Sequence, residues 1–368
     1  MTVDTPGSVE VTSFTCRGLD HAEPQSLGIT YWFDAAPDGD PYPVNVHVSG
    51  GRRGGPEGDG AATFTRIVTV DRVVPGSGRV AVTTRVPGLS PGTWDVTVTP
   101  VQRAPEGSGG RWVPAADPRL PRGSASGRTG FAPVIRVRAP GARLWAWPAL
   151  VTAGAVLGVT AQGLLAWQVG LPVQRLLLLT ITASLLGLLG AKAYYLLTHP
   201  RELRSVLTSG MSVQGFVIVV LGLLVTGSLA LGLPWRAVLD VSAPGLLLGM
   251  TVGRLGCLLG GCCAGRPTAS RWGMWLSDRR LGMRRIPVQL LESALAAVSG
   301  AGALIAVLVL GTSGDGLVFV AALAAYVAGR QVLFPLRDTP RLTAHGRSVT
   351  LALAVLTALG AVAALALR

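Results

Sequence analysis

The stretch 253–268, GRLGCLLGGCCAGRPT, closes a long apolar run and places an arginine, Arg254, among glycines. An arginine at the depth of a lipid bilayer costs several kcal/mol by insertion scales, so it is a candidate functional residue by default. The recurring glycines allow backbone or a ligand to approach closely. The simpler alternative is that Arg254 marks a helix end and extends its side chain to the lipid headgroups. The rest of the chain favours the functional interpretation.

The composition is that of a membrane protein. Of 368 residues, 49% are hydrophobic and only 14% are charged, which is far from the profile of a soluble domain. The formal net charge is +13, but residues 1–140 are nearly neutral, with 14 arginines against 13 acidic residues. Residues 141–368 hold 18 basic and 6 acidic residues. Basic charge beside apolar spans favours anionic lipid headgroups, so we expect no nucleic-acid partner.

Residues 1–140 have the pattern of a soluble β domain. Short segments of strand character alternate with Gly, Pro and Asp clusters, and this spacing is typical of a two-sheet sandwich. The segments cover residues 9–15, 28–33, 42–48, 62–70, 80–86, 94–101 and 134–137. Residues 103–129 are rich in Gly, Pro, Ser and Arg and are predicted to form a flexible linker. No catalytic set stands out, so we expect a binding or spacer module whose partner is unknown.

Residues 141–368 are predicted to cross the membrane seven times. Each apolar run is near the ~20 residues that span a hydrocarbon core. The runs are 148–168, 173–198, 213–233, 236–260, 286–311, 315–333 and 348–367. In the second run, Gly187 and Gly190 are expected to allow close helix packing. The predicted fold is therefore a sandwich-like all-β domain followed by an all-α bundle of seven transmembrane helices.

The membrane half carries four groups of polar side chains. They are Arg254 with Arg266, then Arg285 with Gln289 and Glu292, then Tyr326 with Arg330 and Arg337, and finally Gln214 at the start of the third span. Gln289 and Glu292 are one helical turn apart, as are Tyr326 and Arg330. Guanidinium forks with amides and a phenol suit an anionic phosphate group. We expect Glu292 to pair with an arginine, because an unpaired carboxylate is costly in this setting.

Two other groups have competing interpretations. Cys257, Cys262 and Cys263 offer only three thiols with no histidine nearby, so we predict small buried cysteines packed between helices rather than a metal or redox site. We accordingly expect no metal ion and no cofactor. Asp240 is placed either to cap the start of its own helix or to pair with an arginine, and capping is the default. Pro244 is expected to interrupt that span.

These residues resemble the prolipoprotein diacylglyceryl transferases, which are integral enzymes of bacterial membranes. The family signature GRxGNFxNGExxGRxT is matched in register by Gly253, Arg254, Gly256, Gly261, Gly265, Arg266 and Thr268. Its RHPxQLYE run corresponds to Arg285, Pro287, Gln289, Leu290 and Glu292, and its later tyrosine and arginines correspond to Tyr326, Arg330 and Arg337. The resemblance implies transfer of a diacylglyceryl group from phosphatidylglycerol to the thiol of a lipoprotein precursor or another thiol acceptor.

The chain departs from the family at several polar positions. Cys257, Gly260 and Cys262 stand where the family has two asparagines and a glutamate. Ile286 and Gln214 replace histidines, and Phe334 replaces a glutamate. A group able to take a proton from a thiol is therefore missing from its expected places. The alternative to a transferase is a catalytically altered or inactive member that acts as an anionic-lipid-binding scaffold. A lipid transporter is a third class, but no inverted repeat supports it.

With the resemblance, the candidate residues take roles. Arg254, Arg330 and Tyr326 are predicted to be catalytic. The substrate-binding set is predicted to be Arg266, Arg285, Gln289, Glu292, Arg337, Gln214, Gly253 and Gly256.

The location is predicted to be the cell membrane, with conflicting signals for orientation. The distribution of arginines in the loops puts the N-terminal domain in the cytoplasm, and residues 1–10 lack the basic start and apolar core of a signal peptide. The resemblance implies the opposite orientation. Because long domains translocate largely regardless of charge, we adopt an extracytoplasmic N-terminal domain.

Overall fold

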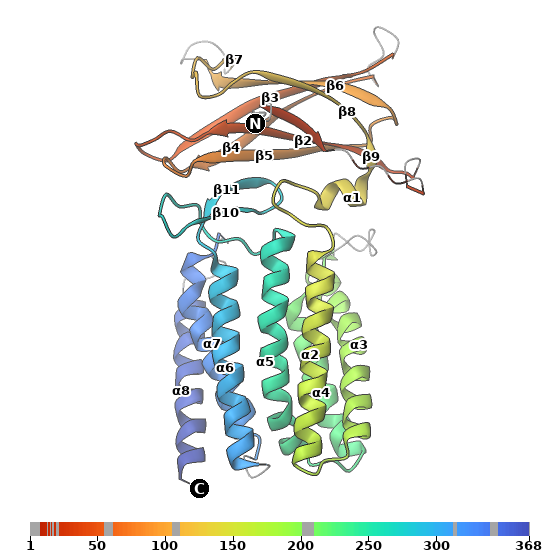
Figure 1. The fold of residues 1–368 in the computed structure, drawn as a ribbon, viewed down its shortest axis with the longest axis vertical. Helices are drawn as coiled ribbons and strands as arrows, with labels where there is room; N and C mark the ends of the chain where they lie inside the picture. Colours follow the sequence, from red (N-terminus) through yellow and green to blue (C-terminus); the bar gives the residue numbers. More distant parts are fainter. Residues whose placement is uncertain are drawn as a thin grey trace, which may run out of the picture. The chain divides into compact units, whose positions relative to one another are not determined.

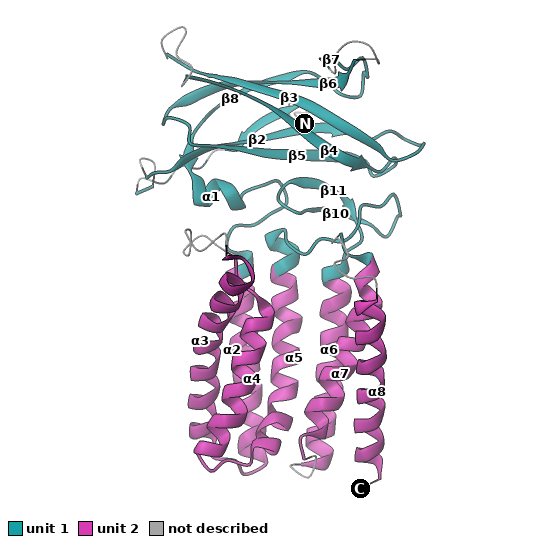
Figure 2. Ribbon diagram, turned by 180° about the vertical axis from the view of Figure 1, so that it is seen from behind, with its two compact units in different colours: residues 1–147, 257–289, 336–339 teal, residues 148–256, 290–335, 340–368 magenta. Residues whose placement is uncertain are grey.

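The computed structural model describes residues 8–12, 14, 16, 18–19, 22–54, 62–104, 111–200, 210–311, 315–338 and 345–367. The chain forms two compact units (Figure 2). Unit 1 comprises Met1–Trp147, Cys257–Gln289 and Leu336–Thr339, and unit 2 comprises Pro148–Gly256, Leu290–Pro335 and Pro340–Arg368. Segments that are distant in sequence therefore belong to one unit, whereas the division into domains 1–140 and 141–368 stays a prediction.

Unit 1 contains two antiparallel sheets, as predicted (Figure 1). The first sheet has the order β1-β2-β5-β11-β10, and β9 also pairs with β2. The second has the order β4-β3-β6-β7, and β8 also pairs with β6. The strands are β1 (Val9–Thr12), β2 (Gln25–Asp34), β3 (Tyr42–Arg52), β4 (Thr63–Val73), β5 (Arg79–Pro87), β6 (Thr93–Arg103), β7 (Trp112–Pro114), β8 (Gly123–Arg128), β9 (Gly130–Phe131), β10 (Met274–Ser277) and β11 (Leu281–Arg285).

The hydrophobic core of unit 1 is built by alternation along the strands. Alternate residues of a strand face the same side of a sheet, and this places Leu27, Ile29 and Tyr31 of β2 in the core, each at most 1% exposed. Val96, Val98 and the fully buried Trp94 of β6 join the same cluster. The period-two pattern read from the sequence is therefore the pattern that buries the sandwich core.

A hairpin from the membrane half of the sequence extends the first sheet. Strand β11 pairs with β5 through Leu281 opposite Val82 and Gly282 opposite Ala81. Met283 of β11 is fully buried and belongs to the sandwich core. Trp275 of β10 stacks on Trp32 with ring centroids 5.8 Å apart. The hairpin between residues 274 and 285 is thus an integral part of the sandwich.

Two details of the β domain differ from the predictions. Residues 134–137 form part of helix α1 (Ala132–Val137) rather than a strand, because Pro133 favours a helix start and the fully buried Ile135 packs beside Gly28 and Gly130. The stretch predicted as a linker contains β7 and β8, both paired with β6. Gly127 also lets β8 lie against β1, because a Cβ there would overlap the Val11 side chain. Residues 13, 15 and 105–110 of the predicted segments lie outside the described residues.

Seven helices in the described part of the chain are long and apolar enough to cross a membrane, which confirms the predicted bundle. Their bounds lie within a few residues of the predicted spans. They are α2 (Ala146–Gln168), α3 (Val173–Thr198), α4 (Val213–Ala230), α5 (Trp235–Gly260), α6 (Val288–Leu310), α7 (Leu317–Leu333) and α8 (Gly346–Ala366), and α7 is followed by the 3₁₀ turn η3 (Phe334–Leu336).

Glycines bring helices of unit 2 into backbone contact. On α2 and α5, a Cβ at Gly245 would lie 2.3 Å from the Gly158 carbonyl oxygen, and one at Gly154 would lie 2.4 Å from that of Gly249. Just beyond, Gln162 of α2 donates a hydrogen bond to Ser242 of α5 at 2.7 Å. Small residues spaced one turn apart allow such close approach in membranes. On α3, Gly190 meets Gly215 of α4 in the same way, as predicted for close packing.

Asp240 caps a helix other than the one predicted. It is fully buried inside α5, and its two carboxylate oxygens accept hydrogen bonds from the backbone N–H groups of Gly316 and Phe319, each at 2.9 Å. The capped helix is therefore α7, whose first turn has no intrahelical acceptors for these groups. The helix α5 also continues through Pro244 instead of being interrupted.

Candidate functional site

The predicted site residues divide between the two units. Unit 2 contains the three predicted catalytic residues together with Gln214, Gly253, Gly256 and Glu292. Unit 1 contains Arg266, Arg285, Gln289 and Arg337. Each group has its own geometry.

In unit 2, two arginines from different helices meet at one buried carboxylate. Glu292 of α6 has a side chain only 1% exposed. Its Oε2 atom lies 3.1 Å from Nη1 of Arg254 on α5, and its Oε1 atom lies 3.7 Å from Nε of Arg330 on α7. The pairing predicted for Glu292 is therefore present. The Arg254 side chain is 15% exposed and that of Arg330 is 40% exposed, so Arg330 is the more accessible cation.

The three side chains of this cluster carry a net positive formal charge. Two guanidinium groups and one carboxylate together have a formal charge of +1. Guanidinium groups present several N–H donors in a planar fork that suits phosphate oxygens. A singly charged phosphodiester would balance the charge of the cluster.

Tyr326 lies on α7 one helical turn before Arg330, on the same face of the helix. It is 3% exposed, and its hydroxyl has no hydrogen-bond partner among the residues that the structure describes. A buried hydroxyl without a partner costs free energy. A ligand oxygen that accepts a hydrogen bond from this hydroxyl would remove that cost.

The helices that carry the cluster are held by a polar contact and by glycine. Ser293, which follows Glu292 on α6, donates a hydrogen bond to the Thr251 carbonyl oxygen of α5 at 2.8 Å. One turn before Arg254 on α5, the partly buried Met250 packs against the core of the bundle. On α7, Gly329 accommodates Leu295 of α6, because a Cβ at Gly329 would lie 2.6 Å from that side chain. These contacts fix α5, α6 and α7 around Glu292.

The remaining predicted residues of unit 2 are Gln214, Gly253 and Gly256. Gln214 is exposed at the start of α4, where its Oε1 atom accepts a hydrogen bond from Ser212 at 2.7 Å. Gly256 is buried in α5. A Cβ at Gly253 would find nothing within 4 Å, so this glycine, one residue before Arg254, leaves open space beside the helix.

In unit 1, Arg285 is part of the internal structure. Its side chain is fully buried, and its terminal nitrogens donate to Asp338 and Asp278, both at 2.8 Å. The same nitrogens also donate to the Gly265 and Leu281 carbonyl oxygens. This arginine joins the hairpin to the two loops that flank it. Its two terminal nitrogens are occupied by protein groups, which gives Arg285 a structural role in this unit, while its buried Nε has no hydrogen-bond partner among the described residues.

The other predicted residues of unit 1 lie in, or form hydrogen bonds with, the loops that Arg285 joins. Arg266 has an exposed side chain, and its backbone N–H donates to the Leu336 carbonyl oxygen. Arg337 is 9% exposed and forms a backbone bridge with Gly265. Gln289 is 1% exposed and donates to the Cys262 carbonyl oxygen at 2.9 Å. Of these three, Arg266 alone presents its side chain to solvent.

The partners of Arg285 were not anticipated from the sequence. Asp278 lies in the turn between β10 and β11, where its carboxylate also accepts the backbone N–H groups of Arg280 and Leu281. Asp338 follows η3 near the end of the described segment. One signal in the sequence pointed to them. Fully buried arginines require charged partners, and residues 141–368 contain only six acidic residues from which the partners of Arg285 could come.

The cysteine cluster contradicts the prediction of cysteines packed between helices. Cys257 lies in the last turn of α5, and Cys262 and Cys263 lie in the loop that follows. Cys257 and Cys262 are half-buried and Cys263 is exposed. Their position at a helix end, where the chain turns out of the bundle, explains the difference.

Comparison with known proteins assigns the family. Residues 137–367 match the prolipoprotein diacylglyceryl transferase family, which covers more than half of the chain. The phosphatidylglycerol–prolipoprotein diacylglyceryl transferase 2 of Clostridium perfringens is 32% identical over 121 residues, covering 30% of this chain and 45% of that protein. The corresponding enzyme of Nitrosomonas europaea is 37% identical over 101 residues, covering 27% and 36%. That of Cupriavidus metallidurans is 34% identical over 103 residues, covering 28% and 38%.

These matches span less than half the length of each curated relative. The family match, in contrast, runs from just before the first apolar helix to the end of the last. The protein is accordingly a multi-pass membrane protein with an added β domain, and its chain belongs to the prolipoprotein diacylglyceryl transferase family.

Proposed function

We propose that this protein transfers a diacylglyceryl group from phosphatidylglycerol to the thiol of a lipoprotein precursor. The observation that carries the proposal is the convergence of Arg254 and Arg330, from two helices, on the buried Glu292. The similarity to enzymes named for this reaction supports the choice of substrate. The excess of one positive charge in the cluster supports binding of a phosphodiester.

The role proposed for each side chain follows from its exposure to solvent and from its position in the cluster. Arg330, the more exposed cation, contacts the phosphate first, and Arg254 approaches it from α5. Glu292 holds both guanidinium groups in place, since its own oxygens already face them. The Tyr326 hydroxyl donates to a headgroup or phosphate oxygen. Cations fixed in a water-poor site can lower the barrier by several kcal/mol as negative charge grows on a leaving phosphate.

The transfer step is a displacement at carbon. The acceptor sulfur forms a bond with the glyceryl carbon that carries the phosphate ester, and the bond between that carbon and the ester oxygen breaks. The electron pair leaves with glycerol phosphate. The thiol proton passes to a phosphate oxygen of this leaving group and from there to solvent, because a phosphate monoester has a second ionisation near pH 6 that the diester lacks. This route needs no protein base, which is consistent with the replaced histidine positions.

The alternative is a lipid-binding scaffold without turnover. The observation that favours it is the loss of the family's polar partners at Cys257, Cys262, Ile286 and Phe334. Such a protein would retain the arginine cluster and bind anionic lipid, while its β domain would recruit a partner.

An assay with purified full-length protein separates the two. Phosphatidylglycerol labelled in its headgroup is supplied in detergent micelles with a peptide that carries a lipobox cysteine. Transferase activity releases labelled glycerol phosphate and adds one diacylglyceryl mass to the peptide. Arg254→Ala is expected to lower this rate at least 100-fold, which corresponds to ~2.7 kcal/mol. Arg175→Ala, at an exposed position of α3, is the matched control and should retain full activity.

Lipid bound without product in the wild-type protein assigns the scaffold. Full activity of a folded Arg254→Ala variant removes the proposed mechanism.

We further propose that the N-terminal domain faces the outside of the membrane. Its support is the orientation implied by the family and the ability of long domains to cross regardless of loop charge. Cys16 is exposed, and it becomes the sole cysteine when Cys257, Cys262 and Cys263 are replaced by serine. A membrane-impermeant maleimide should label this variant in intact cells. Labelling that occurs only after lysis places the domain in the cytoplasm.

A further inference from the structure

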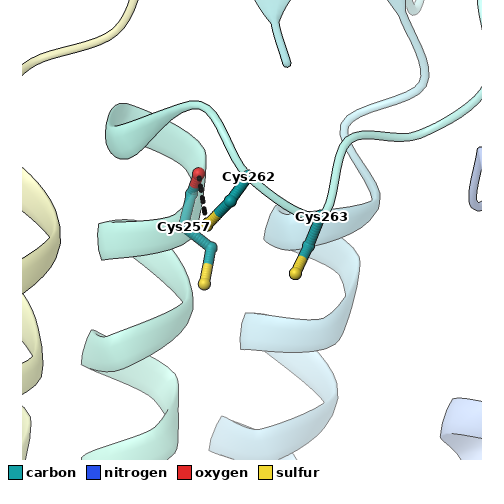
Figure 3. A group of neighbouring side chains, drawn as sticks. All are labelled: Cys257, Cys262 and Cys263. Atoms are coloured by element: carbon teal, nitrogen blue, oxygen red, sulfur yellow. Dashed lines mark hydrogen bonds between the residues drawn. The ribbon is translucent and has the colours of Figure 1, made fainter. Parts of the chain in front are cut away.

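Three cysteine thiols of unit 1 gather at the end of α5. The sulfur atoms of Cys257, Cys262 and Cys263 all lie within 4.8 Å of one another. Figure 3 shows Cys257 on the helix and the other two side chains beside it on the loop. The Cys262 thiol also donates a hydrogen bond to the Cys257 carbonyl oxygen at 3.7 Å, and this bond is the dashed line in the figure.

The way in which α5 ends brings the first two thiols together. Gly261 adopts a left-handed conformation, with φ of 68°, and the Cys262 N–H donates to the Cys257 carbonyl oxygen at 3.1 Å. This is the hydrogen bond of a Schellman cap, in which the residue after the left-handed glycine contacts the residue three positions before the cap. An apolar contact normally occupies these two positions. Here both are cysteines, so the cap itself fixes one pair of sulfur atoms.

The third thiol is not explained by the cap. Cys263 has a positive φ of 56°, which is unusual for a residue with a side chain, and it is exposed. Packing of small apolar side chains does not account for an exposed cysteine turned toward two others. The carbonyl group of Cys262 is in turn held by Gln289, which donates to it at 2.9 Å. The loop is therefore anchored on both sides of the cluster.

We propose that Cys257, Cys262 and Cys263 form a binding site for one thiophilic metal ion, with zinc(II) as the ion of matching chemistry. Thiolates lie about 2.3 Å from zinc, which places neighbouring sulfur atoms about 3.8 to 4.0 Å apart. A separation within 4.8 Å closes to this value by small rotations of the side chains. Three protein ligands leave the fourth tetrahedral position for water or an external thiol.

The surroundings suit a site that carries negative charge. Binding of one zinc(II) ion displaces the three thiol protons to solvent and leaves a net charge of −1 on the complex. Arg279 donates from Nε to the Gly260 carbonyl oxygen at 2.6 Å, at the same helix end. Its guanidinium group therefore brings positive charge to the last turn of α5. The Cys257 carbonyl oxygen keeps its bond from the Cys262 N–H when the thiol proton leaves.

Metal analysis of the purified protein tests the proposal. Reduced full-length protein in detergent is loaded with zinc(II), freed of excess ion and analysed for metal content. We expect about one zinc ion per chain. Each of Cys257→Ser, Cys262→Ser and Cys263→Ser should weaken zinc affinity more than about 100-fold, since even the outer partners of metal ligands contribute about 10- to 100-fold. Cys16→Ser is the matched control and should bind as tightly as the wild type.

Two further measurements guard against misfolding and adventitious binding. Cobalt(II) in place of zinc should give intense sulfur-to-metal absorption in the near ultraviolet, which each cluster variant reduces and Cys16→Ser does not. Zinc should also protect three of the four cysteines from maleimide, with Cys16 labelled throughout. Cys263→Ser changes an exposed side chain, so its thermal unfolding midpoint should equal that of the wild type.

Equal zinc affinity in the wild type and in a folded Cys263→Ser variant overturns the proposal. So does the absence of bound zinc in reduced wild-type protein. Neither result bears on the transferase proposal, which rests on the arginine cluster of unit 2 and has its own assay.

Discussion

Arg254 of α5 and Glu292 of α6 form an ion pair in which the carboxylate is almost completely buried, with 3.1 Å between Nη1 and Oε2. The second carboxylate oxygen faces Arg330 of α7. One acidic side chain of α6 therefore organises two cations, one from α5 and one from α7. This arrangement makes Glu292 a determinant of stability as well as of the site.

Replacing Glu292 with glutamine should destabilise unit 2. The amide keeps the shape of the side chain but removes the negative charge that faces the two guanidinium groups. Removing one partner of a buried pair costs about 3–5 kcal/mol, and the exposure of Arg330 places the expected loss near the lower end. The thermal unfolding midpoint in detergent measures it. Adding Arg254→Met to Glu292→Gln should recover part of the loss, and an unchanged midpoint for Glu292→Gln would contradict the pairing.

Enlarging a glycine between α2 and α5 should disrupt their packing. A methyl group at Gly245 would lie 2.3 Å from the Gly158 carbonyl oxygen, so the helices must separate. Overpacking of this kind costs about 1–3 kcal/mol. Gly302→Ala in α6 is the control, because its Cβ meets nothing within 4 Å. The control should equal or exceed wild-type stability, whereas equal stability of both variants would argue against the close contact.

Asp240→Asn should loosen the first turn of α7. Both carboxylate oxygens accept backbone N–H groups there, and an amide offers only one oxygen while its NH₂ group opposes the second donor. Loss of a helix cap costs about 0.5–2 kcal/mol. Hydrogen exchange at Gly316 and Phe319 should accelerate. The first turn of α4, which has no side-chain cap, serves as the internal control, and equal changes at both helices would contradict a specific cap.

Tyr31 should make the β domain sensitive to alkaline pH. Burial, reinforced by the negative charge of Asp117, raises the pKa of Tyr31 above its ordinary value, and its hydroxyl donates to the Pro121 carbonyl oxygen at 3.0 Å. The folded state thus holds the proton more tightly than the unfolded state. Its contribution is complete below the unfolded pKa of about 10 and is lost as pH rises through the folded value.

Alkaline unfolding followed by phenolate absorbance checks this expectation. Tyr31→Phe should flatten the loss of stability above pH ~10, after correction for its lower stability at neutral pH. An identical pH profile for the variant and the wild type would mean that Tyr31 is not the titrating group.

Local patterns were sufficient to predict most of the elements. The alternation of apolar and polar residues identified strands such as β3 and β6, and the length of the apolar runs identified the helices. Both patterns lie within one segment, so they can be recognised without knowing how that segment packs. The prediction of a strand at residues 134–137 was wrong. The β-branched residues of this segment have strand propensity, whereas Pro133 and the burial of Ile135 favour the helix α1. Propensity is a weak guide where tertiary packing decides the conformation.

The site was predictable only in part, for a similar reason. The pairing of Glu292 with arginine follows from the cost of an isolated charge in an apolar setting. The occupation of Arg285 by Asp278 and Asp338 does not follow, because it depends on how three separate loops meet. The proximity of Cys257 and Cys262 could have been predicted from Gly261, because a glycine after a helix end commonly forms a cap that brings these two positions together. The orientation of Cys263 could not have been predicted in this way.

The strand β11 has a consequence for how the N-terminal region can be altered. Because β11 takes β5 as its neighbour, excision of residues 1–140 would leave an isolated two-stranded ribbon with an open edge. Such ribbons are marginal in water, and open edges invite aggregation. The N-terminal extension therefore cannot be trimmed away like a purification tag.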